Sequence, residues 1–193
     1  MNNKIAVFAS GTGTNFDAIV NAVNEGTLDA EVSLLVSDKI NAGVIEKAQK
    51  RDIDTVVCTP KSFTDKAAYE SAVLADCRAR NVEWIILAGY MRLIGPTLLE
   101  SYANRIINIH PSLLPAFPGK DAIGQAVDKK VKVTGVTVHF VDDGMDTGPI
   151  IAQEALSITE EDTKDDVRRK IQAVEHRLYP HVIQSLLTKE EAK

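Results

Sequence analysis

The chain has 193 residues, with 22 Lys and Arg against 27 Asp and Glu, and a formal net charge of −5 at pH 7. Its 45% hydrophobic and 25% charged residues are typical of a globular protein and exclude disorder over most of the chain. The acidic balance argues against a nucleic-acid partner, because polyanions are bound largely through clustered Lys and Arg. No apolar run approaches the roughly 18 residues that span a bilayer, so we expect a cytoplasmic protein without a membrane partner.

Strand-like and helix-like segments alternate along the first half of the chain. The strands are predicted from short apolar runs, and the helices from apolar residues that recur every three or four positions. In chain order, we predict strands at 4–9, 31–37, 55–59, 84–88 and 105–109, and helices at 15–24, 43–51 and 65–80. This alternation predicts an α/β protein with a Rossmann-like, open and mostly parallel sheet that carries helices on both faces.

The second half of the chain has a different pattern. Residues 133–141 and 150–158 predict two more strands, and the loop between them is too short for a parallel crossover. We therefore expect an antiparallel strand pair near the C-terminus. A last helix is predicted over 163–187 with Thr163 as its cap, and we expect Pro180 to kink or interrupt it.

A loop rich in glycine and hydroxyl groups, GTGTN at 11–15, joins the first predicted strand to the first helix. Glycines let the backbone approach a ligand closely, and the N–H groups at a helix start carry partial positive charge. The loop therefore predicts a cradle for one phosphate group. A dinucleotide loop of the form G-x-G-x-x-G and a turn without a ligand are the alternatives, although Phe16 stands at the third glycine position.

An amide and an imidazole lie close together at the end of the fifth predicted strand. Asn108 and His110 are two residues apart, so on a strand their side chains point to the same face. The carboxyl end of a parallel strand is where ligands bind in open α/β sheets. A lone histidine at a strand end is more often structural, but its pairing with Asn108 favours a functional site.

Three acidic residues, Asp142, Asp143 and Asp146, lie in the loop between the last two predicted strands. A solvated turn is one interpretation. The other is a carboxylate directed at a histidine, which favours the protonated, donating form of the ring. Calcium is a weaker alternative because the EF-hand spacing is missing, and His176 and His181 do not share a helix face, so we predict no metal site.

Five segments, in this order, resemble the phosphoribosylglycinamide formyltransferase family, folate-dependent enzymes of purine (IMP) biosynthesis. They are GTGTN (11–15), LAGYMRLI (87–94), NIHPSLLPAFPG (108–119), VHFVDDGMDTGP (138–149) and VEHRLYP (174–180). NIHPSLLP is common to formyl-folate hydrolases and transferases, whereas GTGTN narrows the choice.

The resemblance runs from Lys4 to about Leu187 and implies one domain with the formyltransferase fold over residues 1–193. Within this domain, an N-terminal lobe of about 1–103 would bind the phosphate and nucleotide. A C-terminal lobe of about 104–193 would carry catalysis and folate binding.

The resemblance also implies a reaction and a catalytic set. The formyl group of the co-substrate 10-formyltetrahydrofolate would pass to the amine of glycinamide ribonucleotide, without a metal. By the family pattern, Asn108 and protonated His110 would donate to the formyl oxygen, and Asp146 would keep His110 charged. A monomer and a homodimer are both left open.

Two groups of binding residues follow from the same resemblance. The ribonucleotide would be held by Gly13, Thr14, Asn15, Gln172 and Glu175, with the phosphate on the first three and the ribose near Glu175. The folate would be held by Lys66, Met91, Arg92, Leu93, Ile94, Asn108, Asp142, Asp143, Gly144, Met145 and Asp146. Lys66 departs from the family pattern, which often places Arg there, and it lacks the bidentate fork that suits a carboxylate.

Four other functions are weighed against this one. A formyl-folate hydrolase would pass the formyl group to water, and a methionyl-tRNA formyltransferase would need an RNA-binding domain and a basic surface; we expect neither relative's appended domain here. A nucleotide-binding module without catalysis would not require the set Asn108, His110 and Asp146. A dehydrogenase is disfavoured by Phe16 in the glycine loop.

Overall fold

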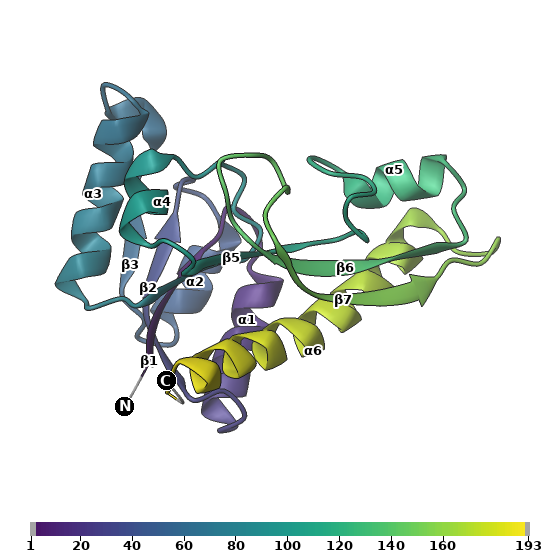
Figure 1. Cartoon of the computed structure of the whole chain (residues 1–193), viewed down its shortest axis with the longest axis horizontal. Helices are drawn as coiled ribbons and strands as arrows, with labels where there is room; N and C mark the ends of the chain where they lie inside the picture. The colour runs from purple at the N-terminus through teal and green to yellow at the C-terminus, as the bar shows by residue number, and fades with distance from the viewer. Residues whose placement is uncertain (1–2, 192–193) are drawn as a thin grey trace.

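The computed structural model describes residues 3–191, and their seven strands form one sheet in the order β3-β2-β1-β4-β5-β6-β7 (Figure 1). The neighbours from β3 to β5 pair in parallel, whereas β6 runs antiparallel to both β5 and β7. The predicted fold class is therefore confirmed. The strands are β1 Asn3–Phe8, β2 Ala30–Ser37, β3 Thr55–Val57, β4 Trp84–Leu87, β5 Ile106–His110, β6 Val133–Phe140 and β7 Ile150–Ser157.

Six α-helices and a short 3-10 helix lie around the sheet in the described part of the chain. They are α1 Thr14–Asn24, α2 Gly43–Gln49, α3 Lys66–Ala79, α4 Pro96–Ser101, α5 Ala122–Asp128 and α6 Lys164–Glu191, with the 3-10 helix η1 at Pro60–Ser62. The sequence did not predict α4 and α5, whose six and seven residues are too short to show a helical period. None of the helices within residues 3–191 is long and apolar enough to cross a bilayer.

The last helix, α6, continues through Pro180 without a break. Of the two outcomes expected at this proline, a kink or an interruption, the interruption does not occur. A proline inside a helix removes one backbone hydrogen bond, but packing against a core can outweigh that loss. Here Tyr179, Val182 and Ile183 flank the proline and are almost completely buried.

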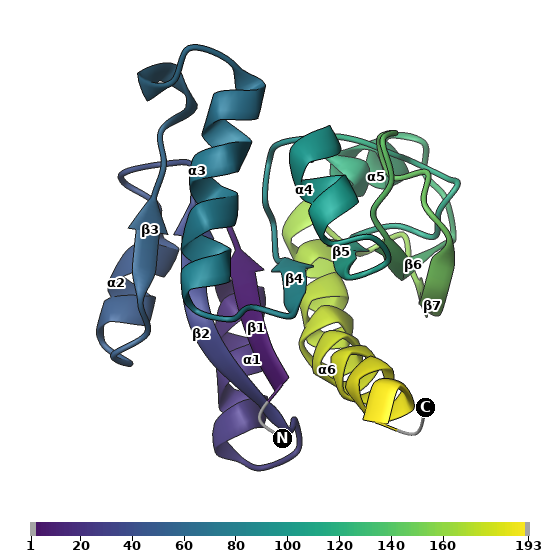
Figure 2. The ribbon, with the colours of Figure 1, turned by 60° about the vertical axis from the view of Figure 1, so that its left-hand side comes forward.

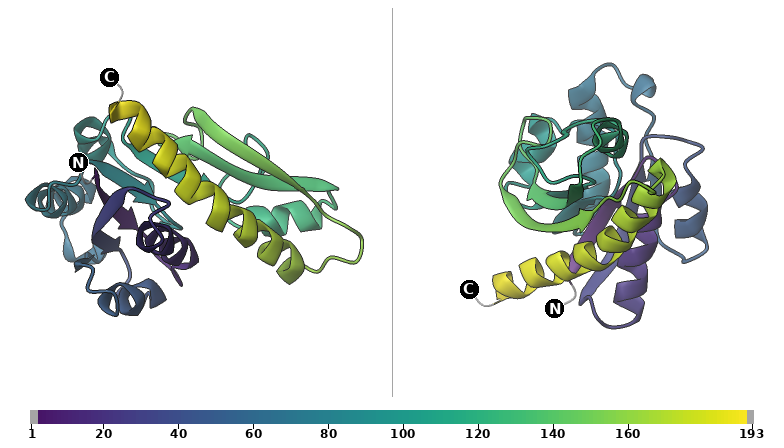
Figure 3. Two further views of the ribbon diagram at one scale, coloured as in Figure 1. Left: turned by 90° about the horizontal axis from the view of Figure 1, so that it is seen from below. Right: turned by 90° about the vertical axis from the view of Figure 1, so that its right-hand side faces the viewer.

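Helices cover both faces of the parallel half because its strands are apolar on both sides. In β1, Ile5 and Val7 belong to the core shared with α1, α2 and α6, whereas Ala6 and Phe8 belong to the core shared with α3 and α4. Figure 2 shows α3 on one side of β1 and β2 with α1 on the other, and Figure 3 shows α6 on the same side as α1.

The antiparallel half extends beyond α3 and α4 (Figure 1). On β5, Ile106 packs into the core under α3 and α4, and Asn108 and His110 follow on the same face at intervals of two. Strand pairing places His139 opposite Asn108 and Thr137 opposite His110. Since directly opposite residues share a face, polar side chains gather where the helical cover ends.

A buried tyrosine fixes α6 to the sheet. The hydroxyl of Tyr179 donates toward the carbonyl oxygens of Leu87 on β4 and Ile107 on β5, at 2.8 and 3.2 Å. Complete burial raises the pKa of Tyr179 well above its usual value, so the hydroxyl keeps its proton and remains a donor. The helix is thereby held against the two strands that lead to the polar cluster.

Candidate active site

A cavity of about 450 Å³ opens at the carboxyl ends of β1, β4 and β5. The strand order reverses between β1 and β4, and such a switch point is the usual ligand position in open α/β sheets. Thirteen of the predicted site residues line it: Asn15, Met91, Arg92, Leu93, Ile94, Asn108, His110, Asp142, Gly144, Met145, Asp146, Gln172 and Glu175. Gly13, Thr14, Lys66 and Asp143 lie outside this lining.

Asp146 is the centre of the polar cluster. One carboxylate oxygen, Oδ2, accepts the N–H of Gly119 at 2.7 Å and lies 3.4 Å from His110 Nδ1. The other, Oδ1, lies 3.5 Å from the amide nitrogen of Asn108 and 3.7 Å from His139 Nε2. The three predicted catalytic residues therefore converge, and His139 joins them.

The carboxylate of Asp146 has a lowered pKa. Burial raises this pKa, but the hydrogen bond with His139, the hydrogen bond from Gly119 and the electrostatic attraction of the two imidazoles act in the other direction and outweigh it. Asp146 is therefore ionised at neutral pH and supplies a fixed negative charge beside the two rings.

The ring of His110 has a defined orientation. Its Nε2 lies 2.8 Å from the carbonyl oxygen of Phe117, and since a carbonyl only accepts, Nε2 carries a hydrogen. Its Nδ1 therefore faces Asp146. Only 5% of His110 is exposed, so the ring is also shielded from water.

The amide of Asn108 turns toward the cluster. Its nitrogen lies 3.2 Å from His139 Nε2, while His139 Nδ1 donates to the carbonyl oxygen of Phe140 at 2.7 Å. A neutral His139 ring accepts from Asn108 at Nε2, and a charged ring donates from the same atom to Asp146. His139 thus links the amide and the carboxylate, a role that its alternating strand position alone did not reveal.

The loop between β6 and β7 is held in a tight turn that aims Asp146 inward. The carboxylate of Asp142 accepts hydrogen bonds from the hydroxyl of Thr147 at 2.7 Å and from the N–H of Gly144 at 3.1 Å. At Gly148, a Cβ would lie 1.9 Å from the Phe140 carbonyl oxygen, so only glycine allows this close approach. Asp142 therefore shapes the loop as well as lining the cavity.

At the other end of the cavity, Asn15 and Glu175 meet across α1 and α6. The amide nitrogen of Asn15 donates to Glu175 Oε2 at 3.2 Å, and the amide oxygen is buried without a partner among residues 3–191. Burial raises the pKa of Glu175 to about 7, although the hydrogen bond from Asn15 acts in the opposite direction. This end therefore offers one free acceptor and one carboxyl group that titrates near neutral pH.

The glycine loop leads directly into α1. Gly13 precedes the helix at φ 78°, a left-handed conformation that favours glycine, and no side chain caps the helix. A Cβ at Gly13 would lie 2.6 Å from Val44 Cγ2. The first N–H groups of α1 have no partner within the helix, so they and the hydroxyl of Thr14 can serve an anion.

Comparison with known proteins assigns a family to this geometry. Residues 3–183 match the family described as Formyl transferase. The chain belongs to the formyl transferase family. It is 56% identical over 184 residues to phosphoribosylglycinamide formyltransferase of Bacillus subtilis (strain 168), with 95% of this chain and 94% of that protein covered.

Two solved structures place the chain within this family. Glycinamide ribonucleotide transformylase 1 from Geobacillus kaustophilus has a TM-score of 0.94 and 55% identity, covering 97% of this chain and 100% of that one. A formyltetrahydrofolate deformylase from Pseudomonas syringae pv. tomato str. DC3000 has a TM-score of 0.89 and 25% identity, covering 98% and 62%. The formyl transferase fold is common to both, and sequence identity favours the transformylase. The resemblance drawn from the motifs is confirmed.

Membership in the formyl transferase family implies a formyl donor of the folate type and small-molecule substrates. Within residues 3–191, no group of three or more His, Cys, Asp or Glu side chains is arranged to hold a metal.

Lys66 lies at the start of α3, outside the cavity of the formyl transferase. Its Nζ is 3.9 Å from Glu70 Oε1, and its side chain is 46% exposed. Asp143 is exposed on the loop after β6. The folate contacts predicted for these two residues remain predictions.

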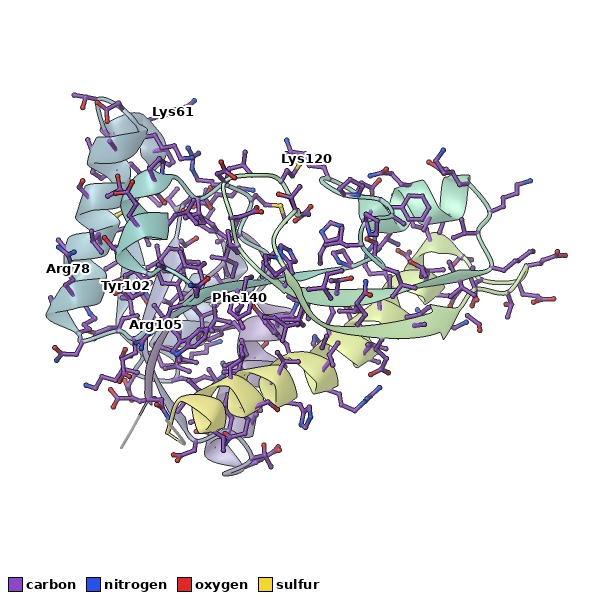
Figure 4. All side chains as sticks on the ribbon, in the orientation of Figure 1. Lys61, Arg78, Tyr102, Arg105, Lys120 and Phe140 are labelled. Atoms are coloured by element: carbon purple, nitrogen blue, oxygen red, sulfur yellow. The ribbon has the colours of Figure 1, made fainter. Side chains whose placement is uncertain are left out.

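Two cations that line the cavity were not predicted as site residues. Lys120 lies on the loop before α5 (Figure 4), and Arg168 lies on the first turns of α6. The spacing of Arg168 from Gln172 and Glu175 is four and seven residues, which puts all three on one helix face. That spacing could have identified Arg168, whereas Lys120 lies in a segment without a motif.

Proposed function

We propose that this formyl transferase moves the formyl group of 10-formyltetrahydrofolate to the amine of glycinamide ribonucleotide, in de novo purine biosynthesis. The observation that carries the proposal is the convergence of Asn108, His110 and Asp146 in one cavity that also reaches Asn15 and Glu175. One end suits a ligand with a single phosphate, and the other holds groups that bind and release protons.

The reaction requires donors for a developing oxyanion. Attack of the amine on the formyl carbon makes that carbon tetrahedral and moves negative charge to the formyl oxygen. The Asn108 amide and the His110 ring supply N–H donors, which turn from their internal partners, His139 and the Phe117 carbonyl, toward that oxygen.

The reaction also moves two protons. When the tetrahedral species collapses, the bond between the formyl carbon and the folate nitrogen breaks; the folate nitrogen gains a proton and the attacking amine loses one. His110 sits between the cavity and the ionised Asp146, so it passes the proton directly or through a water held by the carboxylate. The products are formylglycinamide ribonucleotide and tetrahydrofolate.

The ribonucleotide end uses mostly neutral groups. In this proposal, Gly13, Thr14 and Asn15 bind the phosphate through backbone and side-chain donors at the start of α1. The Glu175 carboxyl accepts from the ribose hydroxyls, and the buried, unpartnered oxygen of Asn15 accepts a further ligand hydrogen. Gln172 lies on α6 between Arg168 and Glu175, about one helical turn from each, and it lines the same cavity.

The folate end lies between two loops. Met91, Arg92, Leu93 and Ile94 follow β4 and form one wall, with Met91 62% and Leu93 49% exposed at its edge. We place the pterin against this wall and under residues 142–146, whose Met145 is exposed on the facing side. Lys66 and Asp143 are proposed contacts for the folate tail where it leaves the cavity.

The proposal divides the domain into two lobes and names its partners. Residues up to about 103 bind the phosphate and nucleotide, and those from about 104 carry catalysis and most of the folate contacts. The partners are small molecules in the cytoplasm, without nucleic acid or membrane. A second subunit is compatible with the proposal but is not needed, because one chain supplies all the residues named above.

A two-substrate assay tests this function. Purified protein is mixed with 10-formyltetrahydrofolate, and the absorbance change of the folate product is followed with and without glycinamide ribonucleotide. We expect turnover only when the ribonucleotide is present. Equal turnover without it would identify a hydrolase instead, in line with the structural likeness to the deformylase.

A further inference from the structure

Ser10 lies at the switch point of the sheet, outside the lining of the cavity. It follows Phe8 and Ala9 at the end of β1 and directly precedes the loop at 11–15, which we call the phosphate loop. Only 3% of Ser10 is exposed. Nothing in the proposed reaction assigns this residue a role.

The hydroxyl of Ser10 joins three strand ends. Its Oγ donates to Asp38 Oδ1 at 2.5 Å and accepts the N–H of Met91 at 2.9 Å. Its own N–H donates to the carbonyl oxygen of Gly89 at 3.1 Å. Because Asp38 takes the hydroxyl proton, a lone pair of the oxygen is left for Met91. Ser10 thus connects the ends of β1, β2 and β4.

The phosphate loop is braced on its other side by α2. The carbonyl oxygen of Gly11 accepts the N–H of Val44 at 3.1 Å, and Gly13 packs against the same residue. A close-packed contact of this kind resists compression. The phosphate loop is therefore held firmly on the side of α2, and a shift of the loop on ligand binding would act on Ser10.

The segment 89–95, which we call the folate segment, is anchored twice. Near its start, Ser10 holds Gly89 and Met91. At its end, Glu70 on α3, itself 2% exposed, accepts the N–H of Gly95 at 2.5 Å. Ser10 is thus shared between the folate segment and the phosphate loop, whereas the hydrogen bond of Glu70 involves no residue of the phosphate loop.

We propose that Ser10, oriented by Asp38, is a positioning residue that couples the two substrate sites. Binding of the ribonucleotide at the phosphate loop tightens binding of the folate against the folate segment, and the reverse holds by the same factor, because a coupling free energy is reciprocal. The inference rests on the proposed function for the identity of the two ligands.

Calorimetry on the full chain tests the coupling with a pair of ligands that cannot react. Tetrahydrofolate and glycinamide ribonucleotide both lack a formyl group, so both can occupy the protein at equilibrium. We measure the Kd of tetrahydrofolate with and without saturating ribonucleotide. In the wild type the ribonucleotide lowers that Kd at least about fivefold, and in Ser10→Ala less than about twofold.

Matched variants separate coupling from general damage. Ser33→Ala removes a serine whose Oγ donates to the Ile5 carbonyl at 3.4 Å, in the same sheet, and it keeps the wild-type coupling factor. Glu70→Leu weakens tetrahydrofolate binding equally with and without ribonucleotide, because it loosens the folate segment alone. Asp38→Asn keeps an oxygen acceptor for Ser10 and retains the coupling, whereas Asp38→Leu loses it.

Each outcome of these experiments supports or overturns the proposed coupling. Equal coupling factors in the wild type and Ser10→Ala, or no coupling in the wild type, overturn the proposal while leaving the proposed function intact. Failure of the wild type to bind either ligand counts against the proposed function and removes the basis of this inference. Should Ser10→Ala not fold, equal coupling in Asp38→Asn and Asp38→Leu overturns the proposal instead.

Discussion

The two ends of the cavity are built from different chemical groups. The end at Asn15, the one residue of 11–15 that lines the cavity, adjoins backbone groups: a glycine at φ 78° and the first N–H groups of α1. The end at Asp146 consists of side chains, with two imidazoles and an amide within 3.7 Å of one carboxylate. In the proposed function, fixed dipoles bind a charge that stays unchanged through the reaction, and titratable groups stand where protons move.

This difference predicts different responses to substitution. At the side-chain end, removing one group changes the protonation of its neighbours, so the rate falls while the fold is kept. At the backbone end, many of the proposed donors are main-chain N–H groups, so damage there requires a distorted main chain and shows as lost affinity and stability. Glu175 is the exception, since it is a titratable group within the otherwise neutral end.

The largest effect is expected for Asp146→Asn. The amide keeps the shape of the carboxylate but removes the charge that faces His110 and His139, so kcat falls by about 10²- to 10⁴-fold while the KM for the ribonucleotide changes little. Steady-state kinetics and a thermal unfolding curve check both statements. Asp128→Asn, at the exposed end of α5, is the control. A wild-type kcat in Asp146→Asn would remove this carboxylate from the mechanism.

The next effect concerns stability and pH at Glu175. Its pKa is about 7 in the folded protein against an ordinary value of 4.5, so between these two pH values the folded state holds a proton that the unfolded state has lost. Stability therefore falls as the pH rises through this window, by up to about 3 kcal/mol. Glu175→Gln removes that loss, which urea unfolding at pH 5 and pH 8 would show. If the free energy of unfolding changed between pH 5 and pH 8 by the same amount in Glu175→Gln as in the wild type, the raised pKa would be contradicted.

A smaller loss is expected for Gly13→Ala. Alanine at this position must adopt φ 78°, and its methyl group would lie 2.6 Å from Val44. We therefore expect the free energy of unfolding to fall by about 2 kcal/mol and the KM for the ribonucleotide to rise about tenfold. Gly26→Ala is the matched control, because its φ is 71° but nothing lies within 4 Å. It isolates the conformational cost, about 1 kcal/mol. Equal losses in both variants would show that the contact with Val44 is unimportant.

The smallest effect is expected at Lys66. If it contacts the folate tail, Lys66→Met raises the KM for the folate by about two- to fivefold without changing kcat, since an exposed ion pair contributes little. Lys66→Arg restores the charge and adds the bidentate fork, so it lowers that KM. Lys61→Met, on the nearby 3-10 helix η1, is the control (Figure 4). A folate KM unchanged in Lys66→Met would end this assignment.

The parallel half of the fold could be predicted because its strands are buried on both faces and appear as short apolar runs. The antiparallel pair β6–β7 followed from its short loop. The antiparallel contact between β5 and β6 could not be predicted, because residues 111–132 are long enough to allow either direction.

Site residues could be predicted from the sequence where they follow the periodicity of a strand or helix. Asn108 and His110 share a face because strands alternate, and the structure brings both to Asp146. The Gly119 amide, the Phe117 carbonyl and the bridge from Ser10 to Asp38 had no signal in the sequence. They depend on how distant loops meet after folding, and any residue carries a backbone N–H or carbonyl.

The bond from Tyr179 to β4 and β5 determines which part of the cavity can move. Glu175 lies one helical turn before Tyr179. Asn108 directly follows Ile107, whose carbonyl oxygen accepts the hydrogen bond from the Tyr179 hydroxyl. The floor of the cavity therefore carries both Glu175 and Asn108 on elements that Tyr179 joins. The roof, residues 141–149, is joined to the rest of the site through the Asp146 carboxylate and through the N–H of Val141, which donates to the Ile106 carbonyl oxygen at 2.9 Å. We expect amide hydrogen exchange to be faster in the roof than around Tyr179.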